Sequence, residues 1–109
     1  MSIRLTHATS LILHALASGY RHGFQMMDAS GLPSGTVYPA LRRLERAGYV
    51  TSQWEPDHEA RAAGRPRRRV YALTASGEAL AGRASDRLAD ARRLLVGDPA
   101  VRPSGPSGS

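Results

Sequence analysis

The stretch Gly35–Val50, GTVYPALRRLERAGYV, decides the fold of this chain. At about 100° per residue, as in an α-helix, Val37, Leu41 and Leu44 fall on one stripe. The apolar stripe must face a core, which leaves the other side of the helix free to contact a ligand. That other side, with Thr36 and Tyr38 on its flanks, carries Gly35, Pro39, Arg42, Arg43 and Arg46.

This helix is expected to begin at an N-cap on Ser34 and to run to Ala47. Pro39 lies inside it and lacks the N–H that would bond to the Gly35 carbonyl. We therefore expect Pro39 to loosen or bend the first turn and to fix how Tyr38 is presented. Its role is expected to be structural, with contact to a ligand only incidental.

A second basic stretch, GRPRRRVYALT at Gly64–Thr74, runs from arginines into a short apolar segment. β-Branched and aromatic residues predict short strands at Tyr49–Glu55 and Arg68–Leu73. The segment between them, Pro56–Pro66, is polar and charged, so we expect it to form a long hairpin tip.

Arginines gather in and beside this tip. Asp57 and Glu59 are the nearby acidic residues expected to oppose their charge. Because alternate residues of a strand share a face, Arg67 and Arg69 are expected on one side and Arg68 on the other. An arginine-bearing tip can follow a DNA backbone or enter a minor groove. The alternative is a hairpin that only adds solubility. The clustered residues are Arg61, Arg65, Arg67, Arg68 and Arg69.

Two helices are expected before this region. The first is capped by Thr6 or Thr9 and runs to about Ser18. The second, His22–Ala29, is expected to bury Phe24 and at least one of the two methionines that follow it.

After the hairpin, Thr74 is expected to cap a last helix that reaches about Leu95. Three helices, a two-stranded hairpin and one more helix predict a mainly α fold, a winged helix-turn-helix with an added C-terminal helix. We accordingly expect a DNA-binding domain at 1–74, a dimerisation helix at 75–96 and a disordered tail, rich in glycine, proline and serine, at 97–109.

The charge of the chain points to an acidic partner. Its 109 residues contain 15 basic and 9 acidic residues, for a net charge of +6. Every basic residue is arginine, whose planar guanidinium suits phosphates and guanine edges. A coding bias against lysine is an alternative explanation for the composition, but it does not explain where the arginines cluster.

Several classes of function lack their usual signals. There is no cysteine, so disulfides and thiolate metal sites are excluded. The four histidines, His7, His14, His22 and His58, show no metal-ligand spacing, and no nucleophile–base pair or paired carboxylates stand out. We expect no metal, no cofactor and no catalysis. The apolar segment Leu11–Ala17 is too short to span a membrane, so a soluble, cytoplasmic protein is expected.

The basic elements fit the dimensions of duplex DNA. A major groove about 12 Å wide admits one helix, whose N-terminal residues approach bases and phosphates. Free backbone N–H groups near Gly35 suit a phosphate oxygen, and Arg42 and Arg46 lie one turn apart. The alternative is a solvated helix face whose arginines pair with Glu45 or Glu55. The residues predicted to contact DNA are Ser34, Gly35, Thr36, Tyr38, Pro39, Arg42, Arg43, Arg46, Arg65, Arg67 and Arg68.

The last predicted helix has a narrow apolar seam typical of helix–helix pairing. We expect this seam, with two leucines of the first helix, to form a homodimer interface. A dimer would place two recognition helices about 34–36 Å apart, in successive major grooves. The alternative is that the seam packs on its own domain. The residues concerned are Leu11, Leu13, Leu80, Ala84, Leu88, Ala91 and Leu95.

Taken together, GTVYPALRRLERAGYV, GRPRRRVYALT and the following ASGEAL resemble the PadR family of bacterial transcriptional regulators over about Leu11–Leu80. The resemblance implies a DNA-binding repressor, usually a homodimer, that often responds to small hydrophobic or aromatic compounds. It also implies that the third helix is the recognition helix. Asp28–Pro33 is shorter than in many relatives, and a single C-terminal helix indicates the small form of the family.

Two other functions compete with a regulator that binds double-stranded DNA. One is a basic RNA-binding or ribosome-associated protein, which would need exposed aromatic rings for stacking. The aromatic residues here are mostly expected in the core, which disfavours it. The other is a protein-interaction module whose arginines pair with acidic protein surfaces.

Overall fold

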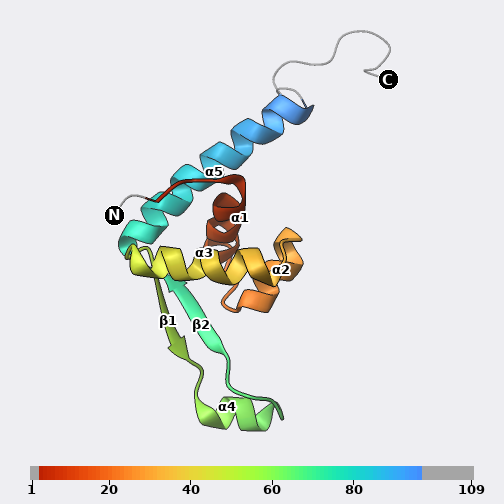
Figure 1. The fold of residues 1–109 in the computed structure, drawn as a ribbon, viewed down its shortest axis with the longest axis vertical. Helices are drawn as coiled ribbons and strands as arrows, with labels where there is room; N and C mark the ends of the chain where they lie inside the picture. Colours follow the sequence, from red (N-terminus) through yellow and green to blue (C-terminus); the bar gives the residue numbers. More distant parts are fainter. Residues whose placement is uncertain (1–2, 97–109) are drawn as a thin grey trace.

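The computed structural model describes residues 3–96 of the chain. Three helices, a two-stranded antiparallel hairpin with a short helix at its tip, and a long last helix form a winged helix-turn-helix (Figure 1). The predicted fold class is therefore confirmed. The elements are α1 (His7–Ala17), α2 (Gly23–Ser30), α3 (Ser34–Arg46), β1 (Val50–Trp54), α4 (Asp57–Ala62), β2 (Arg69–Leu73) and α5 (Ala75–Val96).

The helix caps follow the expected chemistry, with one shift. The Thr6 side chain accepts a hydrogen bond of 3.1 Å from the Thr9 backbone N–H, which caps α1. In α3 the N-cap is Pro33 and not Ser34, because the Pro33 carbonyl already accepts bonds from the backbone N–H groups of the first turn. The helix then runs unbroken through Pro39.

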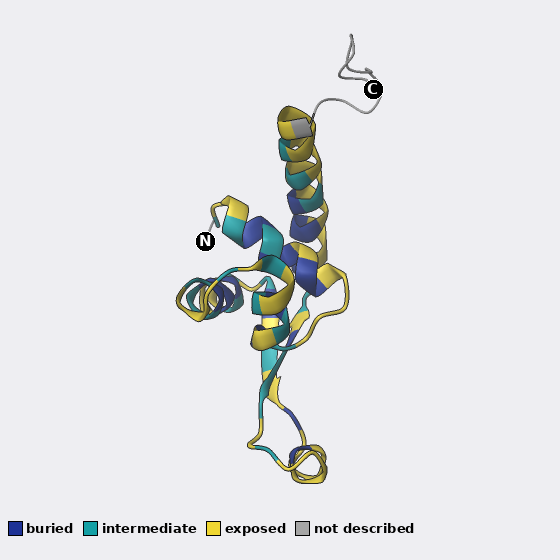
Figure 2. Cartoon of the chain, turned by 90° about the vertical axis from the view of Figure 1, so that its right-hand side faces the viewer, coloured by how far each residue is buried: buried dark blue, intermediate teal, exposed yellow. Residues whose placement is uncertain are grey.

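The core lies where α1, α2, α3 and the first half of α5 meet the base of the hairpin. Figure 2 shows the buried residues on the facing sides of these elements. Periodicity correctly predicted that α3 buries Val37, Leu41 and Leu44. For α2 the prediction was right about Met26, which is buried, and wrong about Phe24, which is 46% exposed. The largest fully buried side chains are Ile12, Leu13, Met26, Leu41, Leu44, Val37 and Val50.

The hairpin leaves this core and extends away from it (Figure 1). β1 and β2 pair in one register, from Val50 opposite Leu73 to Trp54 opposite Arg69. On the free edge of β2, the Tyr71 N–H donates to the Arg21 carbonyl at 2.9 Å, which ties the hairpin to the loop before α2.

The segment predicted as a long hairpin tip, Pro56–Pro66, includes a short helix that was not predicted. It contains α4, which starts after Pro56, carries Asp57 and Glu59 in its first turn and buries Ala60. Acidic residues at a helix N-terminus interact favourably with the helix dipole, and the fixed φ of proline suits a helix start.

α5 begins against the base of the hairpin. The Thr74 side chain accepts from the Gly77 N–H at 3.1 Å and donates to the Gly48 carbonyl at 2.7 Å. The helix then packs along α1 and its far end projects beyond the core (Figure 1). The predicted tail at 97–109 lies outside the described residues. Within residues 3–96, no helix has both the length and the apolar character needed to cross a membrane.

Candidate nucleic-acid interface

One face of α3 is open to solvent and basic. Its N-terminal residues Ser34 and Gly35 are exposed, as are three arginines toward its C-terminus, whereas Thr36, Tyr38 and Pro39 are half-buried. None of the three arginines forms an ion pair with a side chain that the structure describes. Their guanidinium groups are therefore free to bind an anionic partner. These arginines are Arg42, Arg43 and Arg46.

A buried carboxylate organises the hairpin tip. Only 3% of Glu55 is exposed, at the point where β1 ends. Both its oxygens accept hydrogen bonds from the Arg65 guanidinium, and one also accepts from the Arg68 N–H at 3.0 Å. Arg65 is thus held inside the hairpin, which limits the contact with DNA predicted for it. From the sequence, Asp57 and Glu59 were expected to oppose the arginines of the tip, whereas Glu55 forms this pair in the structure.

The charges at this pair reinforce one another. Hydrogen bonding from Arg65, together with the Arg68 N–H, lowers the pKa of Glu55 despite the opposing effect of burial. The same pair raises the pKa of Arg65. On β2, burial raises the pKa of Tyr71, which favours the neutral hydroxyl.

Trp54 lies between two arginines on one face of the hairpin. The guanidinium carbon of Arg69 is 5.1 Å from the centre of the Trp54 ring, and that of Arg67 is 5.9 Å from it. Arg69 also donates to the Ser52 hydroxyl at 2.6 Å, and that hydroxyl donates to Glu45 of α3 at 2.7 Å. The hairpin is thereby connected to the C-terminal half of α3.

Arg68 reaches α2 on the other side. Its guanidinium carbon lies 4.9 Å from the centre of the Phe24 ring, and that ring stacks on His22 at 5.6 Å. The placement of Arg67 and Arg69 against one ring and Arg68 against another agrees with the expected strand alternation. From the sequence, Phe24 was expected only as a core residue, and Trp54 was not among the predicted contact residues, although the predicted strand pairing places Trp54 near the arginines.

These side chains and α3 enclose a crevice of about 200 Å³. Its floor includes Tyr38, whose ring passes close to Gly23 at the start of α2. A Cβ on Gly23 would lie 2.4 Å from that ring, so only glycine allows this approach. Tyr38 at the edge of the basic face of α3 and the arginines of the hairpin therefore line the same crevice.

The fold buries one part of the seam predicted for dimerisation and leaves the other part accessible. Leu80 and Ala84 of α5, and Leu13 of α1, are buried in the chain's own core, which was the alternative considered for the seam. Farther along α5 the seam is open, because Leu88 and Ala91 are half-buried and Leu95 is 86% exposed. Leu11 is half-buried on α1. Of the predicted seam, only these distal residues and Leu11 are accessible to a second copy.

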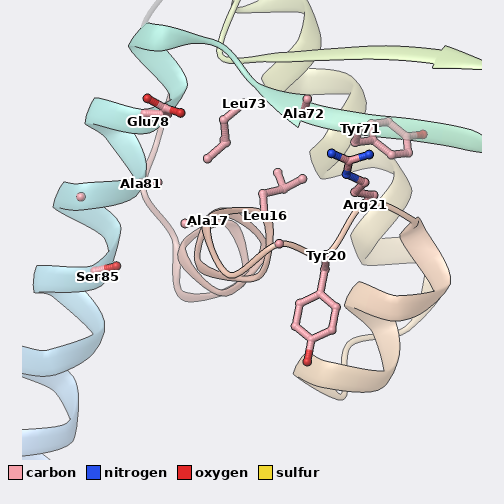
Figure 3. A pocket seen from close by; sticks show the side chains of 12 residues that line it. Leu16, Ala17, Tyr20, Arg21, Tyr71, Ala72, Leu73, Glu78, Ala81 and Ser85 are labelled. Atoms are coloured by element: carbon pink, nitrogen blue, oxygen red, sulfur yellow. The ribbon is translucent and has the colours of Figure 1, made fainter.

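A larger cavity of about 530 Å³ lies between α1, β2 and α5. Figure 3 shows Leu16 and Leu73 pointing toward one another across it, with Glu78 and Ser85 on the α5 side. Its lining is both apolar and polar, and it touches the hairpin as well as α5. No group of three or more possible metal ligands occurs within residues 3–96.

Comparison with known proteins places the chain in a family. The family described as "Transcriptional regulator PadR-like family" matches residues 12–83, which is more than half of the chain. No curated protein matches the chain.

Several solved structures share the fold. A PadR family transcription regulator from Clostridium difficile is 21% identical, with a TM-score of 0.66, and the match covers 83% of this chain and 95% of that one. A protein from Streptococcus mutans is 22% identical, with a TM-score of 0.65 and coverage of 96% and 99%. A PadR-like transcription factor from Bacteroides fragilis is 20% identical, with a TM-score of 0.60 and coverage of 80% and 84%.

Proposed function

This chain belongs to the PadR-like family of transcriptional regulators, and we propose that it is a homodimeric repressor that recognises an operator in duplex DNA. Members of this family are DNA-binding proteins and not enzymes. The observation that carries the proposal is the free arginine face of α3 beside an arginine-lined hairpin. One helix fits the major groove, and a neighbouring hairpin can follow the adjacent backbone.

The contacts within this interface have separate roles. Arg42, Arg43 and Arg46 read or flank the major groove, and the exposed first turn of α3 at Ser34 and Gly35 approaches a phosphate. Thr36, Tyr38 and Pro39 border that turn. In the wing, Arg67 and Arg68 contact the backbone, whereas Arg65 acts mainly by holding Glu55.

A dimer provides the symmetry that such an operator requires. The open distal seam of α5, Leu88, Ala91 and Leu95, with Leu11 of α1, is the surface that we assign to the second copy. Burying such exposed leucines stabilises a dimer by about 1.5–3 kcal/mol per side chain. Domain bounds of 1–74 and 75–96 remain as proposed, although α5 shares the core of the first unit through Leu80 and Ala84.

The cavity between α1, β2 and α5 is the place we assign to a small hydrophobic or aromatic effector. Its volume of about 530 Å³ falls within the range of about 300–1,000 Å³ typical of ligand pockets. Because its walls include both the wing strand β2 and α5, a ligand that alters their separation would change how the wing meets DNA.

RNA binding is the second candidate, because the structure exposes two aromatic rings, whereas the aromatic residues were mostly expected in the core. Phe24 and Trp54 are exposed beside arginines, as a stacking surface for single-stranded RNA requires. The free arginine face of α3 favours duplex DNA over this alternative, because it has the shape and charge that a major groove accepts.

One titration tests these candidates. Anisotropy at about 150 mM salt, the physiological range, compares labelled duplex DNA from upstream of the chain's own gene, a scrambled duplex and a single-stranded RNA. A preference of about 10³ or more for the upstream duplex is the expected result for an operator-binding protein. Equal affinity for the two duplexes, or tighter binding of the RNA, would contradict the proposal.

A further inference from the structure

The crevice between α3 and the hairpin is lined by a group of side chains that we call the aromatic–arginine cluster: Phe24, Trp54, Arg67, Arg68 and Arg69. Its two rings are the unusual feature. Phe24 is 46% exposed and Trp54 52% exposed, although large aromatic side chains are normally kept from water. Each ring has a guanidinium group at its face.

The rings fix the direction of the arginines. Trp54 is flanked by Arg67 and Arg69, with the guanidinium carbons 5.9 and 5.1 Å from the ring centre. A guanidinium that stacks on a ring keeps its N–H groups free at the edge of its plane. Arg67 uses its Nε on the Glu55 carbonyl, at 2.9 Å, and Arg69 uses one Nη on Ser52. Since each guanidinium has five N–H donors, most of them remain available.

The charges of the crevice favour an anion. Arg69 lies 3.9 Å from Glu45, Arg67 lies 3.3 Å from Asp57, and Glu55 is shared by Arg65 and Arg68. Those carboxylates do not line the crevice, whereas three arginines do, so the charge of its lining is positive. The crevice volume of about 200 Å³ lies below the range of about 300–1,000 Å³ for drug-sized ligands, but it admits a phosphate group.

We propose that this crevice holds one phosphodiester of the DNA backbone, and that Trp54 and Phe24 are positioning residues that hold the arginine edges toward it. The proposal rests on the proposed function, because it assigns DNA to the same surface. It adds Phe24, Trp54 and Arg69 to the interface. A phosphate contact carries no base information, so the cluster should strengthen binding to every duplex equally.

The test measures the affinity of the wild-type protein and of the Trp54→Leu and Trp54→Phe variants for labelled upstream and scrambled duplexes. Loss of the stacked ring should weaken binding to both duplexes by the same factor, about 3- to 30-fold from the strength of cation–π contacts. Trp54→Phe, which keeps a ring, should restore most of the affinity. His14→Leu is the matched control, because it removes an exposed ring from α1 that lines neither this crevice nor the cavity between α1, β2 and α5.

Fluorescence supplies a second readout, because Trp54 is the one tryptophan of the chain. In the wild-type protein, saturating DNA should reduce the quenching of Trp54 by acrylamide. Unchanged quenching, or unchanged affinity of Trp54→Leu, would overturn the inference. A Trp54→Phe variant as weak as Trp54→Leu would also overturn it, since the ring would then not be what positions the arginines.

The outcomes separate this inference from the proposed function. If the wild-type protein prefers the upstream duplex but the cluster variants bind as it does, only the inference fails. If the wild-type protein binds neither duplex, the proposed function fails. If the cluster variants lose binding to a single-stranded RNA and not to DNA, the crevice serves RNA and the inference is wrong.

Discussion

Glu55 and Arg65 form a bidentate ion pair at the tip of the hairpin. The pair joins the end of β1 to the segment that leads into β2, and the Glu55 N–H continues the ladder by donating to the Arg68 carbonyl at 2.9 Å. Bidentate pairs of this kind fix geometry as well as charge. Glu55 is therefore the buried carboxylate that joins the two sides of the wing tip.

Replacing Glu55 with glutamine should loosen the tip. Glutamine keeps the size of the side chain but removes the charge that faces Arg65 and Arg68, and it places an NH₂ group against a donor. Amide hydrogen exchange should speed up in Arg65–Arg68 and remain unchanged in α1. Glu59→Gln, an exposed position of α4, is the control. Equal exchange in the two variants would show that Glu55 does not hold the tip.

The same pair predicts an acid transition confined to the wing. Hydrogen bonds from Arg65 lower the pKa of Glu55 in the folded chain. A carboxylate with a lowered folded pKa contributes its stability fully above its unfolded value, about 4.3 for glutamate, and loses it as the pH falls through the folded pKa. Trp54 emission, from the residue beside Glu55, should therefore change below about pH 4.3. The transition should be missing in Glu55→Gln; if it persists there, another group causes it.

The parts of this structure that periodicity governs were predictable from sequence. The stripe of Val37, Leu41 and Leu44 fixed the buried face of α3, because a helix of that length passes the same face several times. α2 has eight residues and too few turns for such a pattern. Burial of Phe24 was therefore predicted from its apolar character alone, and this prediction was wrong.

The wing tip and the α5 seam show a different limit. α4 has six residues, too few to give a period, and the partners of Glu55 lie in a loop whose shape decides which arginine it meets. In α5 the spacing identified an apolar side but not what covers it. The chain's own core covers Leu80 and Ala84, and the distal residues remain open.

A pair of glycines in α5 gives opposite predictions for one substitution. A Cβ on Gly77 would lie 1.9 Å from the Tyr49 carbonyl oxygen, a backbone atom that cannot rotate away, whereas a Cβ on Gly82 would meet nothing within 4 Å. Gly77→Ala should therefore destabilise the fold by about 1–3 kcal/mol. Gly82→Ala should stabilise it by about 0.5–1 kcal/mol, because glycine is unfavourable in a helix. Urea unfolding measures both, and equal effects would contradict the close approach of α5 to Tyr49.

The proposed dimer surface is tested by two neighbouring leucines. Leu94 and Leu95 are both highly exposed, at 88% and 86%, but only Leu95 continues the seam of Leu88 and Ala91. Leu95→Glu should raise the dimer dissociation constant at least about 100-fold, because two-fold symmetry removes two buried leucines and introduces two charges. Leu94→Glu should have the smaller effect. Sedimentation equilibrium distinguishes them. A larger effect of Leu94→Glu would show that the interface lies on another face of α5. A monomeric wild-type protein would contradict the proposed dimer.

The arginines of α3 should differ from those of the wing in what they do to specificity. Arg42 and Arg46 lie one helical turn apart on the exposed face and form no ion pair with the described side chains. An arginine that reads a guanine edge contributes about 1–3 kcal/mol of discrimination between bases. Arg42→Ala and Arg46→Ala should therefore weaken binding to the upstream duplex more than to a scrambled one.

An arginine that contacts phosphate behaves otherwise: its loss weakens all duplexes alike and makes the log–log slope with salt shallower by about 0.9. Arg4→Ala, an exposed arginine before α1, controls for the loss of one charge. Anisotropy titrations at several salt concentrations give both quantities for each variant. If Arg42→Ala and Arg46→Ala change only the salt slope, as a wing arginine should, α3 holds the backbone and base recognition must come from another part of the chain.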